Sequence, residues 1–148
     1  RRMTIETRPL YETSGDLLME SRFVEGLCTL WKCGAWKLPI RYKLDYALYR
    51  DDTIRAFLEV KIRNYMKDDF GEYMISMDKV LTARQYADFA KVPSLLAVQW
   101  QDTSGFIDLG MLKNFRLGVG GRTDRGDSED REPVVLIPIS DFSCKADA

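Results

Sequence analysis

The sequence predicts an α/β fold in which a mixed central sheet is flanked by helices, with the core element order α-β-β-β-α-β. A helical apolar pattern near the N-terminus precedes two alternating apolar stretches that are joined by a polar turn. A second helical pattern then lies between apolar, strand-like runs. At 148 residues the chain is large enough for a hydrophobic core, and we expect one domain over residues 1–148.

The first element is expected to be a helix over Ser14–Cys33 that carries one acid on its apolar side. A capping-box pattern precedes it, and a glycine follows its last residue. Glu20 falls on the apolar stripe, where a carboxylate is costly unless it is paired or bound to metal, whereas Glu25 lies off it. Glu20 is therefore either a site acid or a stripe-edge glutamate that reaches water or pairs with a lysine. The stripe consists of Leu17, Val24, Leu27 and Trp31.

The next two elements are expected to be strands over Tyr42–Tyr49 and Ile54–Arg63, because both alternate and are rich in aromatic and β-branched residues. The polar residues between them suit a turn, which we centre on Asp52. The period of two places one apolar set on a single core face of the hairpin. That set is Leu44, Tyr46, Leu48, Leu58, Val60 and Ile62.

This register places Asp45 across from Glu59 and Lys43 across from Lys61, on the face opposite that apolar set. Directly opposed β-carbons are about 4.5–5.5 Å apart. A two-residue turn would instead shift the register by one residue and put Asp45 and Glu59 on different faces.

Two carboxylates this close repel each other unless a cation lies between them. Oxygen ligands suit hard divalent ions, so Asp45 and Glu59 predict a site for Mg²⁺ or Mn²⁺, with the backbone carbonyl of Val60 as a further ligand. Lys61 could hold an attacking water or offset charge on a phosphate. This is the equipment for metal-dependent cleavage of a phosphodiester. The alternative is that these charges on one strand face are simply solvated, since a single Glu-x-Lys triplet also arises by chance.

Residues 14–101 resemble the PD-(D/E)xK nuclease superfamily. The resemblance lies in the order of the elements, which is an acidic helix, a strand with an aspartate and a strand with Glu-x-Lys. The chain is most similar to small phage-encoded and resolvase-like members. Leu44 stands where many members have proline, and the Gln-x-x-x-Tyr helix pattern of the RecB-like branch is absent, since Tyr86 directly follows Gln85. The positions that match the superfamily motif are Glu20, Asp45, Glu59 and Lys61.

The resemblance implies a restriction-endonuclease-like core and a Mg²⁺- or Mn²⁺-dependent deoxyribonuclease with these four residues as its catalytic set. One alternative is a resolvase of Holliday junctions or other branched DNA that acts as a homodimer. Another is a non-catalytic nucleic-acid-binding protein with the same fold. The intact acid pair and Lys61 favour catalysis.

Composition excludes several other classes of enzyme. The chain has no histidine, which excludes HNH nucleases, histidine-dependent triads and histidine-ligated zinc. Its three cysteines do not match zinc-site spacing, and we expect them to be reduced thiols. No apolar run reaches the length of a membrane span, and the N-terminus lacks a signal-peptide pattern. We therefore expect a cytoplasmic protein of phage or bacterial origin.

The net charge of −1 is not that of a strongly basic nucleic-acid binder, but residues 31–67 carry an excess of basic side chains that could attract DNA phosphates. The glycine-rich segment 116–132 is expected to be a loop, either simply solvated or in contact with DNA through its arginines Arg116, Arg122 and Arg125. A phosphate-binding loop is not expected there, because the strand-then-helix context is missing. The candidate DNA contacts are Lys43, Arg63, Lys79 and Arg122.

The remaining elements complete the predicted order. They are strands over Glu72–Asp78, Ser94–Gln101, Phe106–Leu109 and Val134–Ile139, and a helix over Thr82–Lys91 that begins with a capping box at Thr82.

Overall fold

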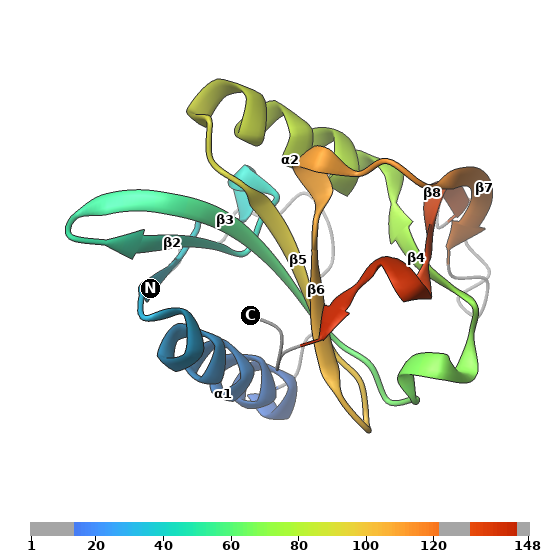
Figure 1. Ribbon diagram of the computed structural model, residues 1–148, viewed down its shortest axis with the longest axis horizontal. Helices are drawn as coiled ribbons and strands as arrows, with labels where there is room; N and C mark the ends of the chain where they lie inside the picture. The colour runs from blue at the N-terminus through green and yellow to red at the C-terminus, as the bar shows by residue number, and fades with distance from the viewer. Residues whose placement is uncertain (1–13, 122–130, 145–148) are drawn as a thin grey trace.

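The computed structural model describes residues 14–121 and 131–144. A six-stranded mixed sheet forms its centre, and α1 (Ser14–Trp31) and α2 (Met77–Ala90) lie on opposite sides of it (Figure 1). Within this sheet β3 and β5 are parallel, and every other neighbouring pair is antiparallel. The predicted α/β class with a mixed central sheet between helices is confirmed.

The strand order in the central sheet is β1-β2-β3-β5-β6-β9. Because β3 and β5 are parallel, the chain must cross over between them, and α2 lies on that crossover. The strands are β1 (Gly34–Lys37), β2 (Tyr46–Arg50), β3 (Thr53–Ile62), β5 (Ser94–Gln99), β6 (Ser104–Asp108) and β9 (Ser143–Cys144).

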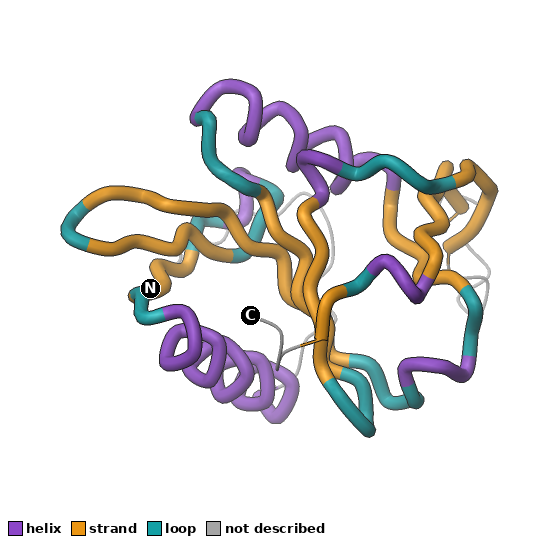
Figure 2. Tube along the Cα trace, viewed as in Figure 1, coloured by secondary structure: helices purple, strands orange, loops and turns teal. Residues whose placement is uncertain are grey.

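A second, three-stranded sheet lies beside the first, at the right of Figure 2. It consists of β4 (Glu72–Ser76), β8 (Arg131–Pro138) and β7 (Arg116–Gly121), in the order β4-β8-β7. Two expectations are corrected here. The third predicted strand is not part of the central sheet, because it pairs with β8 in the second sheet. The start of the glycine-rich segment is a strand rather than a loop. Residues 122–130 lie outside the described part of the chain.

The buried face of α1 and the first residue of α2 differ from the sequence prediction. In α1 the buried side includes Phe23, while Leu17 is 41% exposed, so the apolar stripe is rotated towards Phe23. Helix α2 begins five residues before the predicted Thr82, because the hydroxyl of Ser76 accepts a hydrogen bond from the backbone N–H of Asp78 and caps the first turn. Thr82 is buried within the helix and does not cap it.

Buried apolar side chains form two main clusters on the two sides of β3. The α1-side cluster contains Phe23, Val24, Leu27, Tyr46, Leu48, Leu58 and Val60. The larger α2-side cluster joins the central sheet to α2 and the second sheet, and includes Leu96, Val98, Val80, Ala83, Tyr73 and Ile137. In the β3–β5 register Glu59 lies beside Leu96, so Glu59 faces the α2 side.

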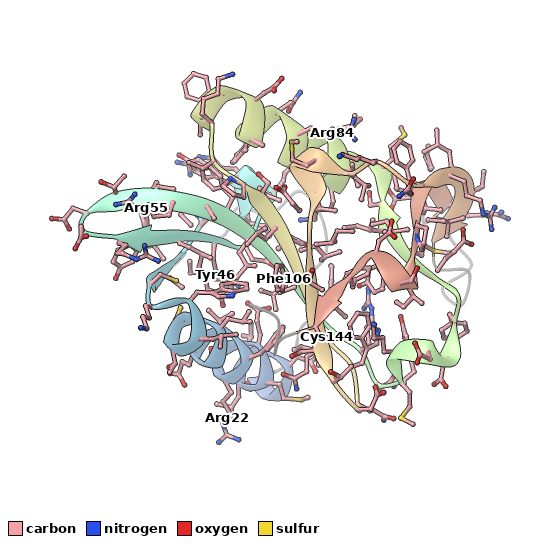
Figure 3. The ribbon with its side chains drawn as sticks, viewed as in Figure 1. Arg22, Tyr46, Arg55, Arg84, Phe106 and Cys144 are labelled. Carbon is pink, nitrogen blue, oxygen red and sulfur yellow. The ribbon has the colours of Figure 1, made fainter. Side chains whose placement is uncertain are left out.

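The β2–β3 hairpin has the predicted register, but its turn is shorter than expected and a bulge compensates for the difference. Its turn has two residues, Asp51 and Asp52, with φ values of 53° and 60°, as in the tight turns that match strand twist. Such a turn alone would shift the pairing by one residue. A bulge restores it, since Tyr49 pairs with Ile54 while Leu48 pairs with Ala56. Arg55, labelled in Figure 3, is the extra residue.

Candidate active site

Asp45 is held by backbone bonds at the point where β2 begins. Its N–H donates to the carbonyl of Leu58 (3.1 Å), and its carbonyl accepts from the N–H of Leu38 (2.9 Å). Its carboxylate oxygen Oδ2 accepts a 2.8 Å hydrogen bond from the N–H of Val60. Asp45 is therefore fixed between β1 and β3, and its carboxylate lies next to the strand that carries Glu59.

The residues before Asp45 are not in a strand, which corrects the predicted start of β2 at Tyr42. A 3₁₀ turn covers Ile40–Tyr42, and Lys43 has a φ of 64°. Lys43 is consequently not paired with Lys61. Leu44, expected on the same core face as Tyr46 and Val60, is instead buried with Leu38 and Ala47 in a separate small cluster.

Glu59 is 1% exposed and has a lysine at each carboxylate oxygen. Nζ of Lys61 lies 3.5 Å from Oε2, as the two-residue spacing in β3 allows. Nζ of Lys79, from the first turn of α2, lies 3.3 Å from Oε1. This second contact is within ion-pair distance but outside hydrogen-bonding geometry, and no described residue donates a hydrogen bond to Oε1.

Burial is the main reason that the pKa of Glu59 is raised to about 7, and the neighbouring charge of Asp45 raises it further. Lys61 and Lys79 act in the opposite direction and lower this pKa, but they do not offset the burial. The charge of an ionised Glu59 carboxylate is thus incompletely compensated by the protein itself.

The oxygen atoms at this point fit a divalent cation. Among the described residues, Oε1 of Glu59 has only the ion-pair contact with Lys79 at 3.3 Å, and the Asp45 carboxylate lies close enough to raise the pKa of Glu59. The carbonyl of Leu58 and the N–H of Val60 both point from β3 towards Asp45. Because the N–H and the carbonyl of one strand residue point to the same side, the carbonyl of Val60 points to this side too, at the position where β2 has not yet begun. No group of three acidic or cysteine side chains suited to a metal occurs in the described part of the chain. Two carboxylates with retained water are a usual way to bind Mg²⁺.

Glu20 pairs with a lysine, which was one of the two expectations, and it also contacts a tyrosine. Its Oε2 accepts hydrogen bonds from the Tyr46 hydroxyl and from Nζ of Lys37, both at 2.7 Å. Tyr46, labelled in Figure 3, belongs to the α1-side cluster, whereas Glu59 faces α2. The structure therefore brings Asp45, Glu59 and Lys61 together and places Glu20 against the residue that follows Asp45.

Replacing Glu20 by glutamine is expected to lower the free energy of unfolding by about 1–3 kcal/mol, because the buried Tyr46 hydroxyl and the Lys37 ammonium lose a charged acceptor. Urea denaturation of Glu20→Gln measures this effect. Glu25→Gln is the matched control, since Glu25 is exposed on the same helix. Equal stability of the two variants would contradict a structural role for the Glu20 contacts.

The four candidate DNA contacts fall in different places. Lys43 is exposed, with Nζ 3.6 Å from Asp78. Arg63 donates to the Tyr73 hydroxyl (3.1 Å), and its guanidinium lies over that ring. Lys79 lies inside the acidic site and also donates to the carbonyl of Lys43. Arg122 lies outside the described residues.

Two further expectations can be compared with the structure. Arg116, a possible DNA contact, makes two 2.8 Å hydrogen bonds to Glu72 across the second sheet. Cys28 and Cys33 form no disulfide, and burial raises the pKa of Cys28 to about 11. A thiol with such a pKa is a poor nucleophile at neutral pH.

Lys79 is the residue at the site whose position sequence reasoning missed. Its place beside Glu59 depends on where α2 begins and on how the first turn of α2 packs over β3. The available signal was Ser76, a good N-cap residue just ahead of Met77–Ala90.

A mixed sheet between helices, with an acid just before β2 and an acid and a lysine on β3, is consistent with the PD-(D/E)xK class of nucleases. The chain belongs to the family described as "Phage putative PDDEXK endonuclease", whose family model matches residues 6–145. It is thus a metal-dependent deoxyribonuclease by family. A comparison with curated proteins gave no significant match.

Two solved structures have similar folds. The Holliday junction resolvase Hjc of the archaeon Archaeoglobus fulgidus superposes with a TM-score of 0.53 at 20% identity, covering 84% of this chain and 87% of Hjc. D212, a nuclease from a fusselovirus, gives a TM-score of 0.50 at 16% identity, covering 94% and 92%. No helix within the described ranges is long and apolar enough to cross a membrane.

Proposed function

We propose that this protein is a Mg²⁺- or Mn²⁺-dependent endonuclease that hydrolyses phosphodiester bonds in DNA. Asp45, Glu59 and the carbonyl of Val60 would hold the ion. The observation that carries the proposal is the buried carboxylate of Glu59, which lies beside Asp45 and whose pKa stays raised although Lys61 and Lys79 are both at ion-pair distance. Asp45 is fixed by Val60 and does not depend on a mobile loop for its position.

When bound, such an ion supplies a more acidic water and neutralises charge on the phosphate. Lys61 lies at the edge of the site with its side chain about one-third exposed, so its ammonium can reach a water or a phosphate oxygen while it remains 3.5 Å from Glu59. Lys79 is less exposed and holds the other side of Glu59. Because the chain has no histidine, the proton from the attacking water must pass to a carboxylate, an amine or solvent.

Cleavage is expected to require a divalent ion. EDTA should abolish it, and Mg²⁺ or Mn²⁺ should restore it. Ca²⁺ should support DNA binding with little turnover, because it accepts oxygen ligands but imposes a looser geometry. Cleavage of end-labelled DNA across these metals measures the effect, with Asp45→Asn as a control that keeps shape but removes charge. Cutting without metal, or full activity of Asp45→Asn, would contradict the metal site.

A second candidate is cleavage of branched DNA by a homodimer, favoured by the fold shared with Hjc. Two active sites would then cut two strands. A panel of linear, single-stranded, flapped and four-way DNA, combined with size-exclusion chromatography, separates the two candidates. A dimer that prefers the four-way junction supports the resolvase, and a monomer that cuts linear DNA supports the simpler nuclease. Lys43, Arg63 and Arg122 are the proposed phosphate contacts in either case.

A further inference from the structure

A cavity of about 620 Å³ lies between α2, the 3₁₀ turn Ile40–Tyr42 and the β2–β3 hairpin. In Figure 1 the turn, in cyan, lies on the same side of the hairpin as α2. The rings of Phe57 and Tyr86 meet edge to face at 5.0 Å in its wall, and the Tyr86 hydroxyl donates to the carbonyl of Tyr42 at 2.9 Å. These two contacts hold Tyr86 against β3 and the 3₁₀ turn.

Three aromatic side chains that line the cavity are open to solvent. Trp36 is 59% exposed, Tyr42 is 38% exposed, and Phe89, at the end of α2, is 91% exposed. Large aromatic side chains gain most when they are buried, so a cluster of exposed ones beside a cavity is typical of a binding surface.

The cavity adjoins the catalytic pair. Phe57 precedes Glu59 by two positions on the same face of β3, a distance of about 7 Å along the strand. On α2, Lys79 at Glu59 and Tyr86 in the cavity wall are seven residues apart, which is close to two turns on one side of the helix. The offset of about 7 Å equals roughly two nucleotide steps of a duplex strand, at 3.4 Å each.

The charges around the cavity suit a nucleic-acid ligand. Its described lining includes Arg41, whose guanidinium lies 5.2 Å from the ring centre of Tyr42, and it contains no aspartate or glutamate. A polyanion that carries flat apolar groups is complementary to the guanidinium of Arg41 and to the aromatic side chains that line the cavity. Every nucleobase has a face that can stack on an aromatic ring, but a base inside an intact duplex does not expose it.

We propose that this cavity binds an unpaired nucleobase roughly two nucleotides from the scissile phosphate, so that the preferred substrate is DNA with unpaired nucleotides close to the cut. Trp36, Tyr42 and Phe89 supply the stacking surfaces. The amide of Gln85 and the guanidinium of Arg41 are the polar groups available to the base edge or its phosphate. This inference rests on the proposed nuclease function and adds the form of its substrate.

Binding can be tested apart from cleavage in an Asp45→Asn background with Ca²⁺. Trp36→Ala and Phe89→Ala are each expected to weaken binding of a DNA with a short single-stranded flap by about 5- to 150-fold, the range for loss of one stacked base. Binding of the fully paired duplex should change less than about twofold. An abasic site at the flap nucleotide next to the duplex should remove the difference. Phe70→Ala is the matched control, because Phe70 is 57% exposed and lies outside the cavity.

Each outcome bears on one proposal. Unchanged flap binding in both variants, or equal losses for flap and duplex, overturns the nucleobase cavity even if the wild type cuts DNA. A preference for flaps that disappears in both variants supports the cavity even if the wild type cuts nothing, in which case the nuclease proposal fails alone. If the variants only convert a dimer into a monomer on size exclusion, a second copy of the chain covers this surface and the inference is overturned.

Discussion

Replacing Lys61 by alanine is expected to slow DNA cleavage by about 10²–10³-fold, the usual effect of removing one preorganised charge donor from a reacting site. The Lys61 ammonium lies 3.5 Å from Glu59 and is partly open to solvent, so it is the cation best placed to contact a water or a phosphate. DNA binding should change little, because phosphate contacts are spread over other basic residues.

Single-turnover cleavage of labelled DNA at saturating Mg²⁺ measures this effect, and binding in Ca²⁺ is measured beside it. Lys113→Ala is the matched control, because Lys113 is an exposed lysine outside the contacts of the acid pair. Asp45→Asn should lose activity to at least the same degree. A Lys61→Ala protein that cuts at the wild-type rate would remove Lys61 from the mechanism.

The sequence predicted correctly which side chains share a face of β3. It did not predict the turn and the bulge through which the chain enters β3. Alternation alone places Glu59 and Lys61 on one face and Leu58 and Val60 on the other, because a strand has only two faces. The turn was harder, because aspartate tolerates positive φ and so permits a two-residue turn without glycine. The bulge at Arg55 has no local signal, since it is set by pairing with β2.

Long-range contacts explain what the sequence could not predict. The pairing of β4 with β8 joins segments about 60 residues apart, and no local pattern shows that Glu72–Ser76 leaves the central sheet. The same holds for Lys79, whose contact with Glu59 follows from the docking of α2. Glu20 was correctly placed on the buried side of α1, but its partner could be identified only once Tyr46 was seen to face that helix.

Replacing Glu59 by glutamine is expected to stabilise the protein at pH 8 in the absence of divalent ions. The pKa of Glu59 is raised from 4.5 to about 7 in the folded chain, mainly by burial, so the folded state keeps a proton that the unfolded chain has released. Stability therefore decreases as pH rises from about 4.5 to 7. At about 1.4 kcal/mol per pKa unit, the ionised carboxylate costs about 3 kcal/mol at pH 8.

Glutamine resembles the protonated acid in shape and charge. Glu59→Gln should consequently match the wild type near pH 4, exceed it by up to about 3 kcal/mol at pH 8, and cleave no DNA. Urea denaturation at both pH values measures the difference, with Glu25→Gln as the exposed control. Added Mg²⁺ should narrow the difference at pH 8, because it binds the folded wild type and not the variant. If Glu59→Gln were less stable than the wild type at both pH values, Lys61 and Lys79 would already satisfy the carboxylate, and the argument that the site requires a cation would fail.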